Sequence, residues 1–336
     1  MDSAYPDESS RKKLFEYLAE HENSVVSGTA LTEKLHSSRQ AVCKLVHALK
    51  EEGLDIGSIP QKGYILRNTD KTDAISPTLI DFLIKDNAVF RNCVYIPRVS
   101  STQHVIKKMA MQDAPEGIVA VTDEQTGGRG RLGRIWKAPF GKNLLFSVLL
   151  RPKLRPGDVQ LLNLAAGMAV RNALRKEYNI PAELKWPNDI LVNDRKICGI
   201  LSEAAGEPDK IYYAATGIGI NTNISDSDME DEIRDKATSV MIETGKACAR
   251  PMLMKHVLEE FAYFIKKLET GEGKANLLAD YAKSCSTIGK EVKVIQDDCE
   301  FNGTAHGITE QGALVVKING EEKIFAAADV HHLRLR

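Results

Sequence analysis

The sequence predicts a multi-domain α/β protein with a helical N-terminal unit, a central mixed α/β domain and a small all-β tail. Its 336 residues are enough for two or three hydrophobic cores. The spacing of apolar residues is helical near the N-terminus, alternates between helix and strand in the middle, and indicates short strands at the end. We expect domains at 1–67, 79–284 and 285–336, with a polar, proline-containing linker at 68–78.

The overall charge is nearly balanced, with 45 basic and 46 acidic residues, so any attraction to nucleic acid must be local. The six cysteines form no C-x-x-C pair, which indicates reduced thiols in a cytoplasmic protein and argues against structural zinc. We find no apolar signal region at the N-terminus and no run of about 18 apolar residues, so we expect no membrane association.

The first 67 residues predict three short helices and a hairpin. Leu14, Phe15 and Leu18 give the first helix an apolar face, and a second helix runs to Leu35. Ser37 or Ser38 can cap a third helix, which Gly53 ends. Residues 56–66 contain Pro60 and Gly63 and predict a two-stranded wing. The third helix carries an apolar stripe at helical spacing: Val42, Leu45, Val46 and Leu49.

Residues 28–47 resemble a helix-turn-helix, and the hairpin makes it a winged helix-turn-helix. No acidic residue lies between Glu33 and Glu51, and a helix N-terminus with polar donors fits the major groove of DNA. Residues 1–67 nevertheless hold nine basic and ten acidic side chains, so a unit that makes only protein contacts stays open as an alternative. The candidate DNA contacts are Gly28, Lys34, Ser38, Arg39, Gln40, Lys44, His47 and Lys62.

The central region alternates strands and helices and ends near Ser284. The continuous apolar run 144–150 predicts a buried strand, and the alanine-rich segment 159–178 predicts a helix. Further strands are expected at 190–192, 199–201 and 212–220. A long amphipathic helix is indicated by Leu253, Val257, Phe261, Phe264 and Leu268.

The tail has short apolar segments separated by Gly or Asn turns. They lie at 292–294, around Phe301, at 314–318 and at 324–325. This pattern predicts a small barrel of five or six strands.

The most informative segment is 127–136, in which four glycines and three arginines share ten residues. Glycines allow backbone N–H groups to approach a ligand, and arginines bind phosphate or carboxylate through planar donor pairs. Residues 125–157 contain eight basic and no acidic side chains, so we expect an anion-binding loop that is mobile when empty. The loop is not a P-loop, and its G-x-G-x-x-G match lacks a βαβ unit. A flexible basic loop or an RNA-binding segment are the alternatives.

Two further motifs follow along the chain. Lys185 begins the motif KWPND at 185–189, where the proline forces an extended backbone. A lysine held there can pair with a carboxylate and an α-phosphate together, although a surface turn is the alternative. The second motif, GIGIN at 217–221, is a strand that ends in the side-chain amide of Asn221.

Together these motifs resemble the biotin–protein ligases, in particular the bifunctional bacterial ligases that also repress biotin operons. Five pieces carry the resemblance in order and spacing along nearly the whole chain: Ser101-Thr102, residues 125–136, KWPND at 185–189, GIL at 199–201 and GIGIN at 217–221. The resemblance implies a mixed-sheet ligase domain of the biotin/lipoate ligase type, followed by an SH3-like β-barrel. The His-containing glycine-rich signature of the lipoate ligases is absent from the sequence.

The resemblance also implies residue roles. Lys185 matches the lysine that contacts both carboxyl and phosphate groups, and with Arg131 and Asp189 it forms the implied catalytic set. The family often has Asn where this chain has Gln103, which puts that contact in doubt. The implied biotin contacts are Ser101, Thr102, Gln103, Gln125, Arg129, Gly130, Arg131 and Lys185. The implied nucleotide contacts are Arg131, Arg134, Trp136, Asn188, Lys196 and Asn221.

The implied activity has two steps. Biotin and ATP form biotinyl-5′-AMP with Mg²⁺ on the phosphates, and biotin then passes to a lysine on the carrier domain of a carboxylase. Asp189 is a candidate to guide the proton of that lysine. No protein nucleophile is needed, so we interpret Cys198 as a small core residue. The metal ligands are not assigned.

The resemblance further implies operator DNA and a ligand-promoted homodimer as partners, with biotinyl-AMP as corepressor. Two alternatives stay open: a ligase whose winged helix no longer represses, and a transcription factor that only senses a small molecule.

Overall fold

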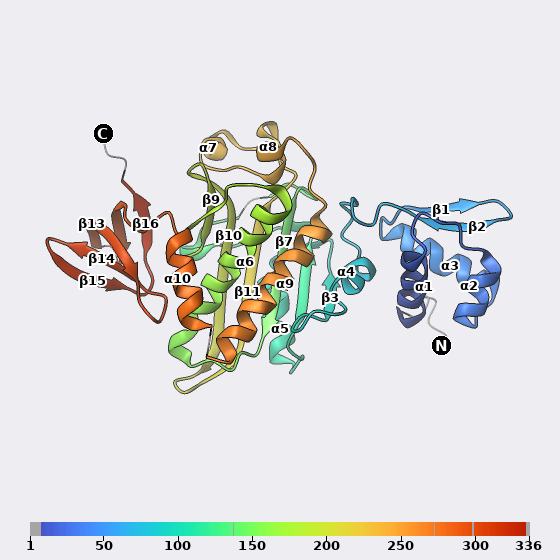
Figure 1. Cartoon of the computed structure of the whole chain (residues 1–336), viewed down its shortest axis with the longest axis horizontal. Coiled ribbons are helices and arrows are strands. Elements are labelled where there is room, and N and C mark those ends of the chain that lie inside the picture. The colour runs from blue at the N-terminus through green and yellow to red at the C-terminus, as the bar shows by residue number, and fades with distance from the viewer. Residues whose placement is uncertain (1–7, 137, 272, 298, 334–336) are drawn as a thin grey trace.

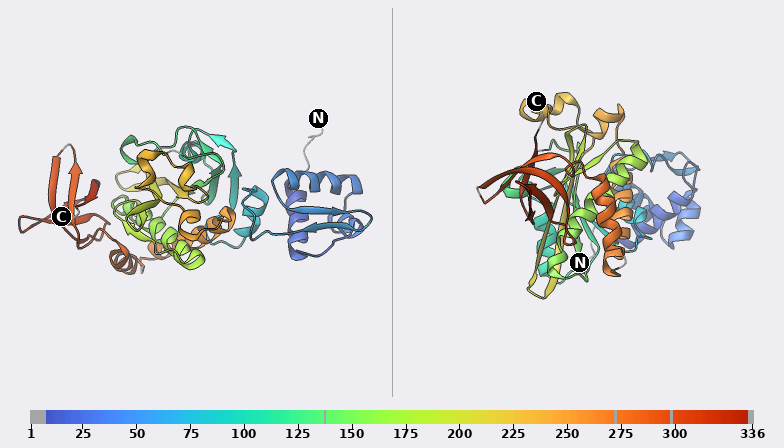
Figure 2. Two further views of the ribbon diagram at one scale, coloured as in Figure 1. Left: turned by 90° about the horizontal axis from the view of Figure 1, so that it is seen from above. Right: turned by 60° about the vertical axis from the view of Figure 1, so that its left-hand side comes forward.

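The computed structural model describes residues 8–136, 138–271, 273–297 and 299–333. Three units follow one another along the long axis of the molecule, with the N-terminal unit at one end and the C-terminal sheet at the other (Figure 1, Figure 2). In the described ranges, no helix is long and apolar enough to cross a membrane.

The N-terminal unit has the predicted three helices and wing. Helices α1 (Glu8–Glu20), α2 (Gly28–Leu35) and α3 (Arg39–Glu51) pack around one core, and strands β1 (Ile56–Ile59) and β2 (Gly63–Leu66) pair antiparallel. Of the two predicted caps for α3, Ser38 is the one used, because its hydroxyl accepts the N–H of Ala41. The predicted apolar stripe of α3 is buried.

The predicted linker is partly helical. Its last two residues open α4 (Pro77–Leu83), which Ser76 caps by accepting the N–H of Leu79. We interpreted the proline as a break, but proline also fits the first helical turn, where its missing N–H needs no partner. Within α4, Leu79 packs in the N-terminal core and Ile80 in the central core. The domain boundaries themselves stay a prediction.

The central unit is a seven-stranded mixed sheet. Its strand order is β3-β5-β7-β11-β10-β9-β8, and among the described pairs only β3 and β5 are parallel. A separate short parallel pair joins β4 (Arg98–Val99) to β6 (Glu124–Gln125). The seven strands are β3 (Asn92–Tyr95), β5 (Ile118–Thr122), β7 (Asn143–Leu150), β8 (Glu183–Lys185), β9 (Asp189–Val192), β10 (Arg195–Glu207) and β11 (Lys210–Asn221).

Helices cover both faces of this sheet. The predicted helices α6 (Gln160–Tyr178) and α9 (Arg250–Glu269) lie over one face together with α10 (Lys274–Ser284) (Figure 1). Helix α5 (Thr102–Met111) packs on the opposite face through Ile106 and Ala110. Strand β7 is buried over its whole length, as its apolar run predicts. Two short helices, α7 (Asp231–Arg234) and α8 (Val240–Thr244), follow β11.

The tail forms a small antiparallel sheet of five strands, the lower of the two predicted numbers. Its order is β15-β14-β13-β12-β16, so β15 and β16 are its edges among the described residues. The strands are β12 (Glu291–Gln296), β13 (Cys299–Ile308), β14 (Leu314–Ile318), β15 (Glu321–Phe325) and β16 (Asp329–His332).

Candidate active site

A cavity of about 660 Å³ lies over the middle of β7, the first half of β10 and the last residues of β11, next to the start of α5. All fourteen side chains and backbone positions that the sequence singles out for ligase chemistry line it, although they come from five separate segments. They are Ser101, Thr102, Gln103, Gln125, Arg129, Gly130, Arg131, Arg134, Trp136, Lys185, Asn188, Asp189, Lys196 and Asn221. How each of them acts stays a prediction.

The inner wall of the cavity is a small hydrogen-bonded network at the N-terminus of α5. The backbone N–H and the hydroxyl of Thr102 both donate to Gln125 Oε1, at 2.8 and 3.2 Å. The Thr102 and Ser147 hydroxyl oxygens lie 2.7 Å apart. Ser147 could not be predicted from the sequence, because it lies inside the apolar run of β7, where no local pattern marks a polar site.

The side chain of Gln103 forms hydrogen bonds within the protein as well as lining the cavity. Its amide nitrogen donates to the carbonyl oxygens of Leu201 and Ala215, at 2.9 and 3.3 Å, so it braces β10 and β11. Its oxygen Oε1 is buried without a partner among the described residues. A buried acceptor left unpaired is costly, so a donor from a ligand would relieve this side chain.

The indole of Trp136 lies on a floor made of two glycines. Gly199 of β10 and Gly219 of β11 are direct partners in the sheet. A Cβ atom on either would lie only 2.8 and 3.0 Å, respectively, from atoms of the indole ring. The ammonium of Lys196 stands 5.4 Å from the ring centroid. Only glycine allows this close approach, so the GIL and GIGIN motifs both serve the same ring.

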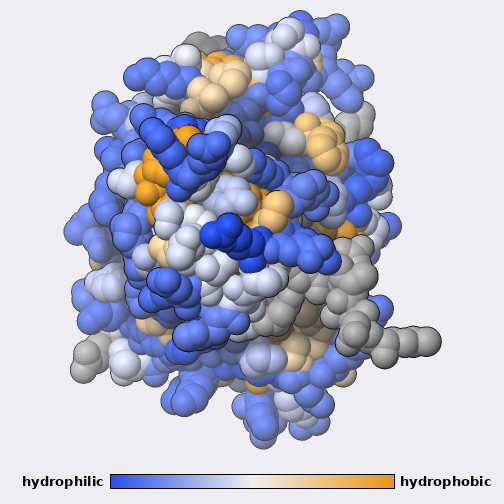
Figure 3. Space-filling model, turned by 90° about the vertical axis from the view of Figure 1, so that its right-hand side faces the viewer, coloured by the Kyte–Doolittle hydropathy of each residue, from blue (hydrophilic) through white to orange (hydrophobic). Residues whose placement is uncertain are grey.

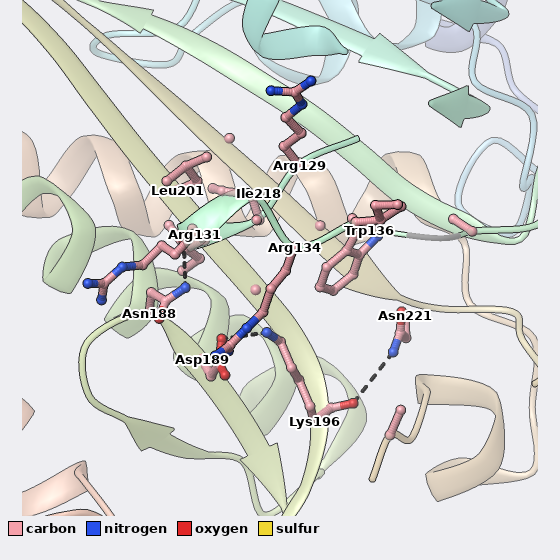
Figure 4. Close-up of a pocket in the computed structure, with 18 of the residues that line it drawn as sticks. Arg129, Arg131, Arg134, Trp136, Asn188, Asp189, Lys196, Leu201, Ile218 and Asn221 are labelled. Carbon is pink, nitrogen blue, oxygen red and sulfur yellow. Dashed lines mark hydrogen bonds and ion pairs between the residues drawn. The ribbon is translucent and has the colours of Figure 1, made fainter. Parts of the chain in front are cut away.

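The glycine–arginine loop closes on itself. The N–H of Gly130 donates to the carbonyl of Arg134 at 2.7 Å, and the N–H of Trp136 donates to that of Gly128 at 2.9 Å. Arg129 is exposed and points away from the centre of the cavity, whereas Arg134 extends toward Asp189 and Lys196 (Figure 4). The guanidinium of Arg134 also forms an ion pair with Asp329 at the start of β16.

The centre of the cavity is strongly cationic. Burial lowers the pKa of Lys185, Asp189 partly opposes this shift, and the nearby charges of Lys196 and Arg134 lower it further. Burial likewise lowers the pKa of Arg131 against the opposing effect of Asp189. The ammonium of Lys196 lies 2.6 Å from Asp189 Oδ1 in an ion pair that is not aligned as a hydrogen bond. Lys185, Arg131, Lys196 and Arg134 thus outnumber the carboxylates that they face, Asp189 and Asp329, which favours an anionic ligand.

Two predicted nucleotide contacts already have structural partners. Asn188 donates from Nδ2 to the carbonyl of Ile200 at 3.1 Å (Figure 4). Asn221 donates to the carbonyl of Thr238 at 3.0 Å and accepts from Asn143 at 3.3 Å. Both amides hold the ends of strands at the edge of the cavity.

The C-terminal sheet forms part of the cavity wall beside Lys185. This contribution was not predicted from the sequence. Asp329, Val330 and His331 line the cavity. The Thr287 hydroxyl accepts the N–H of Trp186 at 3.2 Å and lies 3.0 Å from His332 Nε2. Burial lowers the pKa of His332 to about 4, so the ring is neutral and Nε2 can accept from that hydroxyl.

The candidate DNA contacts lie far from this cavity, in the N-terminal unit. Arg39, Gln40, Lys44 and His47 form an exposed stripe on α3. The end of the molecule that this unit occupies is mainly hydrophilic, with separate apolar patches (Figure 3). Ser38 is exposed and caps α3, and Gly28 is the first residue of α2. The ammonium of Lys34 lies 5.2 Å from the centroid of the Tyr17 ring, and Lys62 is exposed in the turn of the wing.

Comparison with known proteins identifies the fold and its parts. Residues 95–221 match the profile of the Biotin/lipoate A/B protein ligase family, residues 287–333 match the Biotin protein ligase C terminal domain, and residues 10–65 match an HTH domain. A biotin protein ligase from Aquifex aeolicus, solved in complex with biotin and ATP, superposes with a TM-score of 0.64. It is 30% identical, and the match covers 73% of this chain and 100% of that one.

Two relatives match almost end to end. The Bifunctional ligase/repressor BirA of Bacillus subtilis is 33% identical over 94% of this chain and 97% of its own length. The Escherichia coli protein of the same name is 30% identical over 90% of this chain and 92% of its own. The chain therefore belongs to the biotin protein ligase family. Its match to these relatives includes the N-terminal HTH unit, which confirms the resemblance drawn from the motifs.

Proposed function

We propose that this protein is an ATP-dependent biotin–protein ligase that also represses transcription. The observation that carries the ligase activity is the buried cationic centre, in which Lys185 and Arg131 face a cavity large enough for a small ligand. Biotin carboxylate and ATP are both anions, so their reaction requires a site that offsets their mutual repulsion.

In the first step the biotin carboxylate oxygen attacks the α-phosphorus of ATP, and pyrophosphate leaves. Lys185, which lines the cavity, would contact the carboxylate and the α-phosphate together, and Arg131 and Arg134 would stabilise the charge that develops on the phosphoryl oxygens. Trp136 on its glycine floor presents a flat face for the adenine ring. Gln125 and Thr102 fix the inner wall around the biotin ring system.

In the second step the amine of the acceptor lysine attacks the carbonyl carbon of the adenylate, and AMP leaves. The amine must lose a proton, and Asp189, a carboxylate that lines the cavity, would guide it. Asp189 is paired with Lys196, so this role requires Lys196 to shift toward the phosphate. The carrier domain of a carboxylase is the proposed acceptor.

Magnesium enters with ATP as part of the substrate. In the described ranges no three His, Cys, Asp or Glu side chains gather as a metal cage. The carboxylates of Asp189 and Asp329 are each paired with a cation. Mg²⁺ ordinarily binds through phosphates and few protein ligands, which fits this arrangement.

The repressor activity is carried by the exposed stripe of α3 and the wing. We propose that two copies of the chain bind a two-fold operator, because a single recognition helix reads few base pairs. Biotinyl-AMP would act as corepressor. Retained ligase activity with no operator binding would leave the ligase assignment intact and remove the repressor.

The test is a biotinylation assay. Purified protein, ATP, biotin and an apo carrier domain should yield a carrier detected by streptavidin, and omission of ATP should abolish the signal. A Lys176→Ala variant, changed at an exposed lysine of α6 outside the cavity, serves as the matched control. If the wild type binds biotin but never labels the carrier, the protein is a sensor and the ligase assignment is wrong.

A further inference from the structure

A buried arginine outside the cavity joins the connecting segment (residues 68–78) to the base of the glycine–arginine loop. Arg250, the first residue of α9, is only 4% exposed. Its Nε donates to Asp73 Oδ1 at 2.6 Å, and its Nη1 donates to Asp123 Oδ1 at 2.7 Å. Two further bonds reach the carbonyl oxygens of Asp73 and Asn143, at 2.9 and 3.1 Å. One guanidinium thus holds two carboxylates that are 50 residues apart in the chain.

Asp123 controls both ends of the loop. It comes two residues before Gln125, whose side chain forms the inner wall of the cavity. Its own carbonyl oxygen accepts the N–H of Gly141 at 3.0 Å, which lies beyond the far end of the loop. Tyr95 supports the same carboxylate from β3 with a 2.5 Å hydrogen bond. A shift of Asp123 therefore moves the base of the loop that carries Arg129, Arg131 and Arg134.

The connecting segment is bonded just as firmly to the DNA-binding unit. Glu22 at the end of α1 accepts the N–H and the hydroxyl of Thr69, at 2.8 and 2.9 Å. Glu52 at the end of α3 accepts the N–H and the hydroxyl of Thr78, at 3.2 and 2.9 Å. Asp73 lies between these two attachments. The segment is thus held at both ends by the winged unit and in its middle by Arg250.

We propose that Arg250 is a positioning residue that couples the state of the loop over the adenylate to the DNA-binding unit. The inference rests on the proposed function, because it needs an adenylate that orders the loop. An adenylate that fixes the loop also fixes Asp123 at its base. Arg250 moves with Asp123 because the two are paired, and its bond to Asp73 passes the displacement to residues 68–78. Because coupling is reciprocal, restraint of the winged unit strengthens adenylate binding by the same factor.

The test is amide hydrogen exchange on the full-length protein, with and without biotin plus ATP. In the wild type, ligand should slow exchange in the loop and, by about fivefold or more, in residues 68–78. Asp73→Asn should form adenylate at a rate within twofold of wild type and keep the slowing in the loop, yet lose it in the segment. Asp123→Asn should lose the slowing in the segment and also release adenylate faster.

Two further variants test whether the slowed exchange in residues 68–78 depends on the Arg250–Asp73 pair or on the loss of any carboxylate. Asp70→Asn removes an exposed carboxylate of the same segment and should behave as wild type. Asp73→Glu keeps the charge and should retain part of the slowing, which distinguishes lost coupling from a damaged fold.

The outcomes separate the two proposals. If the wild type releases no pyrophosphate with biotin and ATP, the proposed function is wrong, and the coupling falls with it. If it releases pyrophosphate but ligand leaves residues 68–78 unchanged, or if Asp73→Asn keeps their slowing, the coupling alone is overturned.

Discussion

Single side chains decide the chemistry of the cavity through their charge and their burial. Lys185 has no ion-pair partner among the described residues, and burial disfavours its charged form. The cavity therefore favours an anionic ligand that can act as the partner of this buried ammonium. An incoming carboxylate or phosphate acts as that partner, so binding of the anion also stabilises the charged form of Lys185.

Replacement of Lys185 by alanine should slow adenylate formation by about 100- to 1,000-fold, because one transition-state charge contact is worth about 3–4 kcal/mol. The protein should remain folded, since the side chain faces the cavity. Pyrophosphate release at saturating biotin and ATP measures the effect, with Lys176→Ala as the control. A rate within threefold of wild type would remove Lys185 from the mechanism.

Secondary-structure elements place these side chains, as the platform formed by Trp136 over Gly199 and Gly219 shows. Strands β10 and β11 present glycines to one another in register, and the loop lays Trp136 on both of them. The chain has two tryptophans, and the other one, Trp186, is buried and donates to the carbonyl of Gly312 at 2.9 Å. The fluorescence of the protein can therefore report on the platform.

A methyl group added to the platform should displace the indole. Gly219→Ala should weaken ATP binding by about tenfold or more, because the Cβ atom would meet a rigid ring and overpacking typically costs about 1–3 kcal/mol. ATP should change the tryptophan fluorescence of the wild type and of Gly157→Ala, an exposed glycine outside the cavity whose Cβ position is free and whose φ is not positive. An unchanged ATP affinity in Gly219→Ala would show that adenine does not use this face.

We predict that His332 in the tail sheet makes the stability of the protein depend on pH. The pKa of His332 is about 4 in the folded protein, because of burial, and about 6.5 in an unfolded chain. Below pH 6.5 the unfolded chain binds a proton that the folded chain does not, so stability falls from pH 6.5 toward pH 4.

His332→Asn should remove this share of the acid loss. The melting temperature of the wild type should therefore drop by about 2 °C or more beyond that of the variant between pH 7 and pH 4.5. His306→Asn, at an exposed position of β13, is the matched control. Equal drops in wild type and His332→Asn would show that the ring is not buried in its neutral form.

Local patterns in the sequence predicted the elements and picked out side chains that line one cavity, and failed where a contact is long-range. The glycines and arginines of the loop and Lys185 stood out because such residues have few structural uses at that density. Arg250 did not, because a charged residue at the start of a long amphipathic helix normally faces solvent. Asp329 is 195 residues from Arg134, and no local signal connects them.

At the scale of the whole molecule, the central unit meets the tail sheet at the cavity and meets the winged unit through the connecting segment. The tail sheet docks behind Lys185 through Thr287 and His332, and the winged unit is attached through residues 68–78. Both the tail sheet and the winged unit are therefore bonded to the parts of the protein that they adjoin. Binding in the central cavity can therefore influence a surface at the far end of the molecule without a large rearrangement.

The last prediction concerns that influence. A winged helix reads useful specificity only as a pair on a two-fold site, and the N-terminal unit has no heptad repeat to form the pair. We therefore propose that the central unit supplies the dimer surface. The glycine–arginine loop is exposed at Arg129 and Ile135, so an adenylate that rearranges the loop would change the surface available for pairing.

We expect adenylate to tighten the dimer and the dimer to tighten DNA binding, with a coupling of about 1–3 kcal/mol, or about 5- to 150-fold. Sedimentation gives the dimer constant and footprinting gives the affinity for operator DNA, each with and without a non-hydrolysable adenylate analogue. An apo carrier domain should reverse both effects, because it consumes the adenylate. Arg39→Ala should lower the affinity for DNA but leave the ligand-linked change in the dimer constant intact. If both constants are the same with and without the analogue, the protein joins a ligase to a DNA-binding unit without a switch between them.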